Sequence, residues 1–357
     1  MKKIISALLC AAMVLGMSLG LSSCSSGEKG KAVLKVYNWG QYISDVNDGG
    51  EIDVISEFEK QYNCTVVYDT FASNEEMYTK LKSGSVDYDV VIPSDYMISR
   101  MIEEGMLEKL DYNNIPNAAD LMESFRSPDY DPTGEYSVAY TWGTVVLIYN
   151  STMVEEVPDS WNALWDQRYT GKILMFNNSR DAFGIAEKLL GYSQNTTDEA
   201  EINACADLLK KQKAVLQTYV MDEIFDKMEI GEAAVAPYYA GDAINMMDEN
   251  PDLGAVIPKE GTNQFIDAMC VVKGTQNKEL AEKFINFMCE TEIAAANIDY
   301  ICYSTPLQSV YDALDEEMKN SIAYPSDEVL EKCESFVHLP KETNALMQDL
   351  WNEILAE

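Results

Sequence analysis

The chain has 357 residues and carries 60 acidic against 26 basic side chains, a formal net charge of −34. An acidic excess of this size excludes nucleic acid as the expected partner, because phosphate binding needs a basic face. Hydrophobic residues make up 47% of the chain, which is ample for packed cores, and the length favours two domains over one.

The first segment of the chain is typical of a secretory signal. Two lysines precede an apolar stretch at 4–21, which ends in Leu21-Ser22-Ser23-Cys24. The ending resembles a bacterial lipobox, in which the cysteine becomes lipidated. We therefore expect a signal peptide at 1–23, a lipidated tether at 24–31 beginning with Cys24, and anchoring to the outer face of the cell membrane. An ordinary signal with an incidental cysteine and a retained membrane helix are the alternatives, and both also place the body outside the cytoplasm.

The body of the chain then alternates predicted strands and helices. Strands are expected at 33–39, 64–68 and 89–93, with helices at 51–62 and 74–81 between them. The third strand is continuously apolar, as in a sheet that is covered on both faces. This order predicts an α/β domain with a mostly parallel sheet.

A second α/β set follows, and two β-rich segments separate it from the rest. We interpret the segments at 136–149 and 265–272 as crossings between two lobes, the first with a bend near Gly143. The other expected elements are helices at 160–166, 181–190, 198–211, 277–289 and 341–356 and strands at 172–176, 233–237 and 254–257. The predicted division gives lobe 1 residues 32–141 plus 268–311, and lobe 2 residues 142–267 plus 312–357.

The sequence does not offer the side chains that several kinds of functional site require. His338 is the one histidine, which excludes metal sites with two or more histidines and argues against a nucleophile–His–acid triad. No glycine-rich phosphate loop is present, and the body cysteines form no Cys-x-x-Cys pair, so neither a nucleotide cofactor nor a zinc cluster is expected. Disulfides and buried thiols are both open for Cys64, Cys205, Cys270, Cys289, Cys302 and Cys333.

Residues that directly follow strands are the candidate ligand contacts, because ligands of open α/β sheets bind beyond the carboxyl ends of the strands. Aromatic and acidic side chains gather in five such segments, at 38–42, 94–96, 177–181, 238–242 and 264–267. Rings cover methylene groups and attract cations, and aspartates accept charge-assisted hydrogen bonds from ammonium groups. The combination predicts a cleft for a flexible organic polycation, which the lobes enclose by hinge motion.

Segments spread over the whole mature chain carry a resemblance to a known family. They are 37–43 (Tyr-Asn-Trp-Gly-Gln-Tyr-Ile), 73–82, 88–94, 189–193 with 195–198, and 284–288. Together they resemble the spermidine/putrescine-binding proteins of bacterial polyamine ABC transporters. The resemblance implies a type II periplasmic-binding-protein fold with two crossover segments and a ligand cleft between the lobes. It also implies a monomeric binder without enzymatic activity, cofactor or metal, which delivers its polyamine to permease subunits.

The resemblance further implies which residues bind the ligand. Asp267 matches the central ammonium-binding acid of the family, Asp181 an acid that holds an amine in the second lobe, and Asp242 an acid of putrescine-binding relatives. The full set of matching positions is Trp39, Tyr42, Ser94, Tyr96, Asn178, Asp181, Tyr239, Asp242, Phe265, Asp267 and Tyr303.

Departures from the family pattern leave the preferred polyamine open. Gly40 stands where a threonine is common, Asn178 stands where one relative has an acid, and two tryptophans of the cleft are replaced. The family's late glutamine has no clear counterpart near 337–338. Loss of an acid favours putrescine, whereas Asp181 can still serve spermidine. The alternatives are the same fold with a sugar, a thiamine-like cation or a ferric complex, and a secreted two-carboxylate hydrolase.

Overall fold

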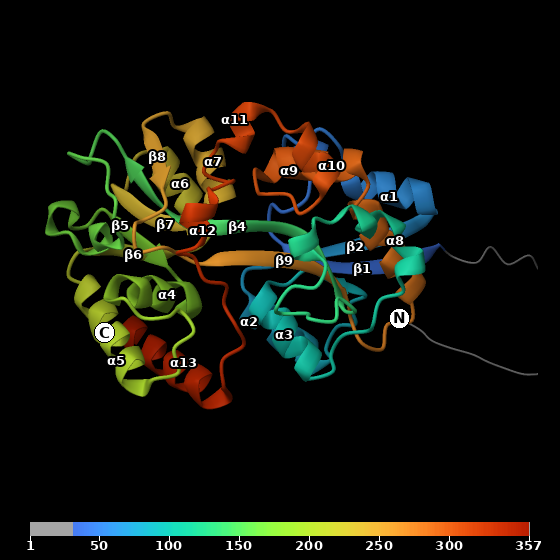
Figure 1. The fold of residues 1–357 in the computed structure, drawn as a ribbon, viewed down its shortest axis with the longest axis horizontal. Coiled ribbons are helices and arrows are strands. Elements are labelled where there is room, and N and C mark those ends of the chain that lie inside the picture. Colours follow the sequence, from blue (N-terminus) through green and yellow to red (C-terminus); the bar gives the residue numbers. More distant parts are fainter. Residues whose placement is uncertain (1–30, 357) are drawn as a thin grey trace, which may run out of the picture. The chain divides into compact units, whose positions relative to one another are not determined.

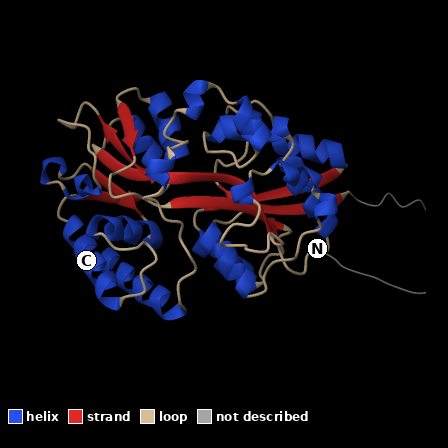
Figure 2. Ribbon diagram, viewed as in Figure 1, coloured by secondary structure: helices blue, strands red, loops and turns tan. Residues whose placement is uncertain are grey.

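One mixed sheet runs through the part of the chain that the computed structural model describes, residues 31–356. Its strands follow the order β2-β1-β3-β9-β4-β7-β5-β6, and β8 pairs with β4 beside this path. Helices cover both faces of the sheet (Figures 1 and 2). The predicted signal peptide and Cys24 lie outside the described residues. Among the helices at 31–356, none combines the length and the apolar character that a membrane crossing needs.

The strand β1 (Ala32–Trp39) is the centre of a parallel region. It pairs in parallel with β2 (Cys64–Phe71) and β3 (Val90–Val91). Parallel neighbours need crossover connections, and these are α1 (Val54–Tyr62) and α2 (Asn74–Ser83). The β-α-β-α-β order predicted from the sequence is therefore confirmed.

The two segments predicted as crossings are the two long antiparallel strands of the sheet. They are β4 (Ser137–Asn150) and β9 (Gln264–Val271), which pair with each other. The bend expected near Gly143 was wrong, because β4 is continuous there and its register shifts between Ala139 and Thr141. Gly143 has another role, since a Cβ at this position would lie only 2.9 Å from Cζ of Phe265.

The second set of strands extends from the far half of β4. That half pairs with β7 (Val235–Tyr239) and β8 (Leu253–Val256), and β7 continues to β5 (Ile173–Phe176). The edge strand β6 (Leu216–Val220) was not predicted, because its residues are mostly half-buried and form no apolar run. It pairs in parallel with β5.

Helices and short turns fill the connections between these strands. The segment predicted as a helix at 160–166 is a 3-10 helix, Trp161–Trp165. The other 3-10 helices are Val46–Asp48, Tyr112–Asn114, Pro116–Asp120, Glu123–Phe125 and Gln167–Tyr169. The remaining α-helices are α3 (Asp95–Glu103), α4 (Ser179–Leu190), α5 (Glu199–Gln212), α6 (Ile224–Glu229), α7 (Ala240–Glu249), α8 (Lys278–Met288), α9 (Thr291–Ile301), α10 (Gln308–Ala313), α11 (Glu316–Lys319), α12 (Asp327–Leu330) and α13 (Lys341–Ala356).

The buried hydrophobic residues form three clusters that follow from this arrangement. Alternate residues of β1 point to opposite faces, so Val36 packs with α1, α8 and α9 while Tyr37 packs with α2 and α3. The third cluster surrounds β5 and β7, where Trp161 and Phe176 are fully buried. The residue boundaries that we expected for the two lobes stay a prediction.

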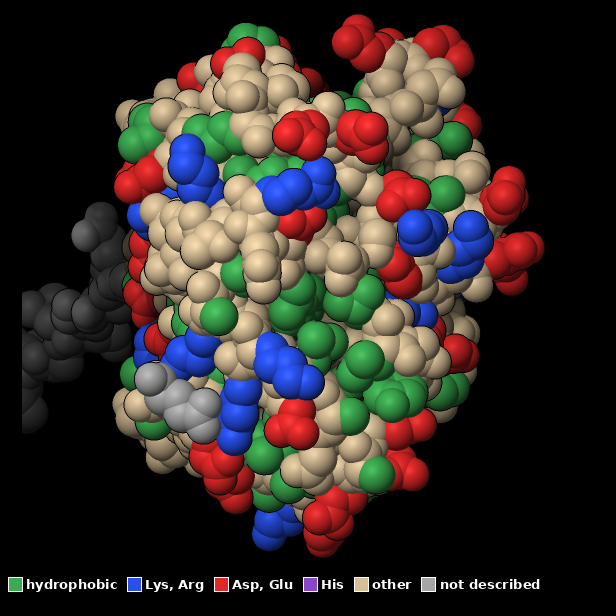
Figure 3. Space-filling view, turned by 90° about the vertical axis from the view of Figure 1, so that its left-hand side faces the viewer, with side chains coloured by type: hydrophobic (Ala, Val, Ile, Leu, Met, Phe, Trp, Pro, Cys, Tyr) green, Lys and Arg blue, Asp and Glu red, His purple; other side chains and the backbone are tan. Residues whose placement is uncertain are grey.

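Charged side chains of both signs are interspersed on the outer surface. Figure 3 shows one end of the molecule, with acidic groups concentrated along its rim and hydrophobic groups towards its middle. Most of the cysteine thiols lie below the surface. In the described part of the chain, Cys205, Cys270, Cys289, Cys302 and Cys333 form no disulfide, and all but Cys333 are buried.

Candidate ligand-binding cavity

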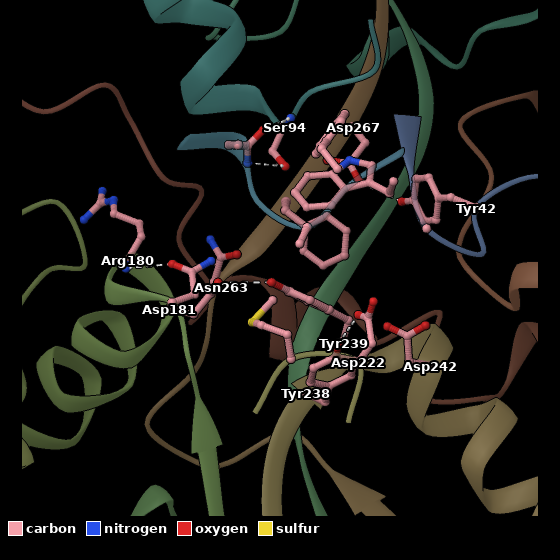
Figure 4. A pocket seen from close by; sticks show the side chains of 18 of the residues that line it. Tyr42, Ser94, Arg180, Asp181, Asp222, Tyr238, Tyr239, Asp242, Asn263 and Asp267 are labelled. Carbon is pink, nitrogen blue, oxygen red and sulfur yellow. Dashed lines mark hydrogen bonds between the residues drawn. The ribbon is translucent and has the colours of Figure 1, made fainter. Parts of the chain in front are cut away.

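A cavity opens where the carboxyl ends of the parallel strands meet, as expected for an open α/β sheet. It encloses about 890 Å³, part of which is open to solvent, a size that suits a small-molecule site. Most of the residues that line it follow β1, β2, β3, β5, β6 and β7 or lie at the start of β9, and Tyr303 and Phe336 come from segments that follow helices (Figure 4). All eleven positions expected from the sequence are among them: Trp39, Tyr42, Ser94, Tyr96, Asn178, Asp181, Tyr239, Asp242, Phe265, Asp267 and Tyr303. Their contacts with a ligand stay a prediction.

The carboxylate of Asp267 is 4% exposed and only half satisfied by the protein. The hydroxyl of Tyr42 donates to its Oδ2 atom at 2.7 Å, and Thr141 holds that hydroxyl from the other side at 2.5 Å. No hydrogen bond from the described residues reaches Oδ1, although this atom is buried. Burial raises the pKa of Asp267 to about 6, and the Ser94 and Tyr42 hydroxyls oppose this rise. A buried acceptor of this kind favours a ligand that brings its own donor and positive charge.

Two further carboxylates in the cavity follow the same design. Tyr239 donates a hydrogen bond of 3.1 Å to Oδ2 of Asp181, and Tyr303 donates one of 2.7 Å to Oδ2 of Asp242. Burial raises the pKa of Asp181 to about 7, although the hydrogen bond from Tyr239 lowers it. Burial also raises the pKa of Asp242 to about 7, and the nearby charge of Asp222 adds to this effect. Both acids are therefore poised to lose a proton when a cation binds.

The fold places these two acids at helix N-termini. Asp181 is the third residue of α4, and Asp242 is the third residue of α7. The positive end of the helix dipole and the unpaired N–H groups there favour the ionised carboxylate. In both acids the helix N-terminus stabilises the ionised form, whereas burial disfavours it.

Aromatic rings form a continuous wall beside the acids. Tyr239 contacts Phe265 edge to face at a centroid distance of 5.3 Å, Phe265 contacts Tyr303 at 5.9 Å, and Tyr303 contacts Tyr42 at 5.2 Å. Because Gly143 leaves room for it, the Phe265 ring can approach the strand β4 closely. Ring faces and edges of this kind bury methylene groups and attract a nearby cation.

Three of the expected residues bond mainly to the protein. Ser94 exchanges two hydrogen bonds of 3.1 Å with Asn74, and the Tyr96 hydroxyl donates to Oε1 of Glu75 at 2.9 Å. The side chain of Asn178 caps α4 by accepting from the backbone N–H two residues further on. These residues shape the cavity, and each uses at least one polar atom to hold an element in place.

Arg180 is the one basic residue among those that line the cavity, and its charge is directed elsewhere. Its guanidinium donates to the Gln194 carbonyl at 3.0 Å and to Oδ1 of Asn195 at 2.9 Å. The same group lies over the ring of Phe336 at 4.3 Å, and this ring meets Tyr96 edge to face at 6.1 Å. The one cation of the lining therefore donates its hydrogen bonds outside the cavity, although its charge still lowers the pKa of Asp181.

Eight lining residues were missed by the sequence analysis: Phe71, Ala72, Asn74, Met221, Asp222, Phe225, Asn263 and Phe336. Phe71 ends β2 three residues beyond the predicted strand, where its ring packs at a tilt against Trp39 with a centroid distance of 4.5 Å. Asp222 follows β6, the strand that was not recognised. Recognition of β6 would have identified Asp222, because it follows a strand as the other candidates do. Phe336 lies in a segment without periodicity, and no local signal indicates it.

The arrangement can bind a cation, and it offers little for catalysis. Carboxylates and rings converge on one space, but no nucleophile lies there with a histidine base. Across residues 31–356, no three His, Cys, Asp or Glu side chains are placed to hold a metal ion. The carboxylates and rings that do converge there suit reversible binding of a cation.

Comparison with known proteins identifies relatives of the chain. The model for the family described as "Bacterial extracellular solute-binding protein" matches residues 88–333, and a model described as "Hypothetical lipoprotein (MG045 family)" matches residues 1–123. The chain is 31% identical to the spermidine/putrescine-binding periplasmic protein of Escherichia coli (strain K12) over 321 residues, which cover 89% of this chain and 90% of the relative.

Solved structures give the same answer. A putative spermidine/putrescine ABC transporter protein of Listeria monocytogenes is 37% identical, with a TM-score of 0.85 over 91% of this chain and 99% of its own. The spermidine/putrescine ABC transporter substrate-binding protein PotD of Streptococcus pneumoniae is 34% identical, with a TM-score of 0.77 over the same shares. The fold is the two-lobed α/β fold of periplasmic binding proteins, with β4 and β9 as its crossover segments. The chain belongs to the bacterial extracellular solute-binding protein family.

Proposed function

We propose that this protein binds a polyamine, putrescine or spermidine, outside the cytoplasm and delivers it to the permease of an ABC transporter. The observation that carries the proposal is the Oδ1 atom of Asp267, a buried acceptor that has no partner among residues 31–356 and lies in a cavity walled by rings. An alkyl ammonium group supplies the missing donor and the balancing charge. The protein is a binding component of a transporter and makes or breaks no bond.

The positions of the acids support a stretched ligand with several positive charges. Asp181 lies on one side of Tyr239 and Asp242 on the other, while Asp267 lies across from the Tyr239 ring (Figure 4). Ammonium groups pair with these carboxylates, and the methylene groups between them pack against Tyr239 and Phe265. Each buried pair that forms removes the cost of an unpaired buried charge.

Closure and release complete the transport role. Polyamines enter the open cleft, the lobes close through the crossover strands, and the closed form is recognised by the permease subunits. The lipidated Cys24 and the short tether keep the protein at the membrane surface, where a monomer reaches the permease. The apolar leader with its Leu-Ser-Ser-Cys ending and the match of residues 1–123 to a lipoprotein model support the anchor.

Thermal unfolding of residues 32–357 tests the ligand class. The purified protein is heated with putrescine, spermidine, spermine, glucose, thiamine or ferric citrate. A polyamine at 100 times its dissociation constant should stabilise the folded state by about 2.7 kcal/mol, and the other compounds should leave it unchanged. Stabilisation by glucose, thiamine or ferric citrate in place of the amines would assign the cavity to another solute. Turnover of a glycoside panel would identify a hydrolase.

A further inference from the structure

Two carboxylates, not one, lie at the Asp242 end of the cavity. Asp222 follows β6 and lies beside Asp242 and Tyr238 in Figure 4. The Tyr238 hydroxyl donates to Oδ1 of Asp222 at 3.3 Å, just as Tyr303 donates to Oδ2 of Asp242. In each carboxylate the second oxygen accepts no hydrogen bond from the described residues. Both acids are held by a tyrosine and keep one oxygen for another donor.

The second oxygen of Asp222 lies near a glycine. Gly40 follows β1 on the opposite wall, and a Cβ placed there would come within 3.8 Å of Oδ2 of Asp222. This is an ordinary van der Waals distance, so the backbone of Gly40 passes close to the carboxylate without covering it. A long side chain at position 40 that extends from this Cβ can therefore reach Oδ2.

The charge at this end demands a donor with several N–H groups. Asp222 and Asp242 repel each other, and Arg180, the one basic lining residue, donates to groups outside this end. A primary ammonium has three N–H donors and can bond to two carboxylates at once. A secondary ammonium has two, and its methylene groups extend on both sides, so it does not fit at the end of a cavity.

We propose that Asp222 is a ligand-binding residue that shares one primary ammonium terminus of the ligand with Asp242. This inference rests on the proposed function, since it assigns the ligand group bound at one end of the same cavity. It adds an acid that neither the sequence pattern nor the matching positions of the family indicated. It also explains why the exposed Asp222 is fixed by the buried Tyr238.

Calorimetric titration of Asp222→Asn tests the shared contact. We expect putrescine and spermidine to bind about tenfold more weakly, by the same factor, because both have primary termini. The matched control is Asp226→Asn on α6, which removes the same charge from an exposed position outside the cavity. It should change binding less than about twofold. The difference should persist in about 0.5 M salt, which screens long-range effects but not a direct contact.

The combined variant measures the sharing directly. If Asp222 and Asp242 bind one ammonium, the effect of the Asp222→Asn/Asp242→Asn pair should differ from the product of the single effects by more than about threefold. Effects that simply multiply, or an Asp222→Asn protein that matches Asp226→Asn, overturn the inference. Wild-type protein that binds no amine overturns the proposed function instead, so the two failures are distinguishable.

Substitution of Gly40 provides an independent test. Gly40→Lys places a protein ammonium in reach of Oδ2 of Asp222, whereas Gly40→Met adds a chain of similar length without charge. Competition for the carboxylate should make the lysine variant at least about tenfold weaker than the methionine variant in binding putrescine. Equal binding by the two variants contradicts a ligand contact at Asp222. Thermal unfolding without ligand shows that both variants are folded.

Discussion

The hydroxyl of Tyr42 donates a 2.7 Å hydrogen bond to Asp267 across 225 residues of sequence. It joins the segment after β1 to the crossover strand β9, and the other buried oxygen of Asp267 has no partner in the described part of the chain. A tyrosine hydroxyl donates a single hydrogen, so it can fix a carboxylate without neutralising it. The same pairing recurs at Asp181 and Asp242, which makes it the organising feature of the cavity.

The first prediction concerns Asp267→Asn, which should weaken binding and strengthen the fold. Loss of the acid should cost roughly 2–5 kcal/mol of polyamine binding, because the ammonium loses its buried partner. Because the folded-state pKa is raised to about 6, the ionised group destabilises the folded protein at neutral pH. We therefore expect the variant to gain roughly 1–3 kcal/mol of stability at pH 8. Calorimetry and urea unfolding measure the two effects.

The pH dependence of stability tests whether the gain in Asp267→Asn comes from the loss of the ionised carboxylate. Wild-type stability should fall as pH rises from about 4 to about 6, since the folded state holds the Asp267 proton more tightly than the unfolded state. At pH 4 the variant should therefore show little of the gain. If the variant binds putrescine within about twofold of wild type, Asp267 does not contact the ligand.

The second prediction is that polyamine affinity rises with pH. Alkyl ammonium groups stay protonated below about pH 9, whereas Asp181 and Asp242, with pKa values of about 7, must lose their protons to pair with them. Affinity should fall at least tenfold between pH 8 and about pH 5.5, and protons should be released on binding at pH 7. Titration calorimetry in buffers of different ionisation enthalpy measures the release. Constant affinity over this range would show that the acids are already ionised in the empty cavity.

Much of the site was predictable because the carboxyl ends of strands can be located from local patterns. The segments after β1, β3, β5 and β7 each stand between an apolar run and a helix start, so their aromatic and acidic residues could be assigned to one edge of the sheet. Asp181 and Asp242 lie in two of these segments, and the family resemblance singled them out. The acids could be assigned to one edge, but their tyrosine partners could not, because these contacts depend on tertiary packing.

The remaining parts of the fold and the site depend on tertiary contacts that no local sequence pattern indicates. β6 is a half-buried edge strand, so neither it nor Asp222 behind it was recognised. Phe336 lines the cavity while its ring packs on the Arg180 guanidinium, a contact between segments more than 150 residues apart. Gly143 illustrates a third case, since the glycine was interpreted as a bend although it serves the packing of Phe265.

The third prediction separates the hydrogen bond of Tyr42 from its ring. Tyr42→Phe keeps the ring contact with Tyr303 but removes the donor to Asp267. Because this hydrogen bond lowers the pKa of Asp267, its loss should raise that pKa above about 6. Putrescine binding should weaken about three- to tenfold at pH 7 and recover in large part at pH 9. The pH profile of the dissociation constant checks this, and an equal loss at both pH values contradicts it.

The fourth prediction concerns Gly241→Ala at the second position of α7. Alanine favours a helix over glycine by about 1 kcal/mol, so propensity alone predicts a gain in stability. A Cβ at this position would, however, lie 1.6 Å from Cδ1 of Tyr303 and 2.8 Å from the carbonyl oxygen of Ile301. Overpacking of this kind costs typically 1–3 kcal/mol or more, and the ring can move only by releasing Asp242.

The overlap outweighs the propensity, so Gly241→Ala should be less stable than wild type and should bind putrescine more weakly. Urea unfolding measures the first effect, and calorimetry measures the second. Gly40→Ala is the matched control, because its Cβ meets only an ordinary contact and stability should change by less than about 0.5 kcal/mol. In a Tyr303→Ala background the cost of Gly241→Ala should shrink, since the carbonyl of Ile301 alone remains in the way. An unchanged cost there would show that the backbone, not the Tyr303 ring, requires the glycine.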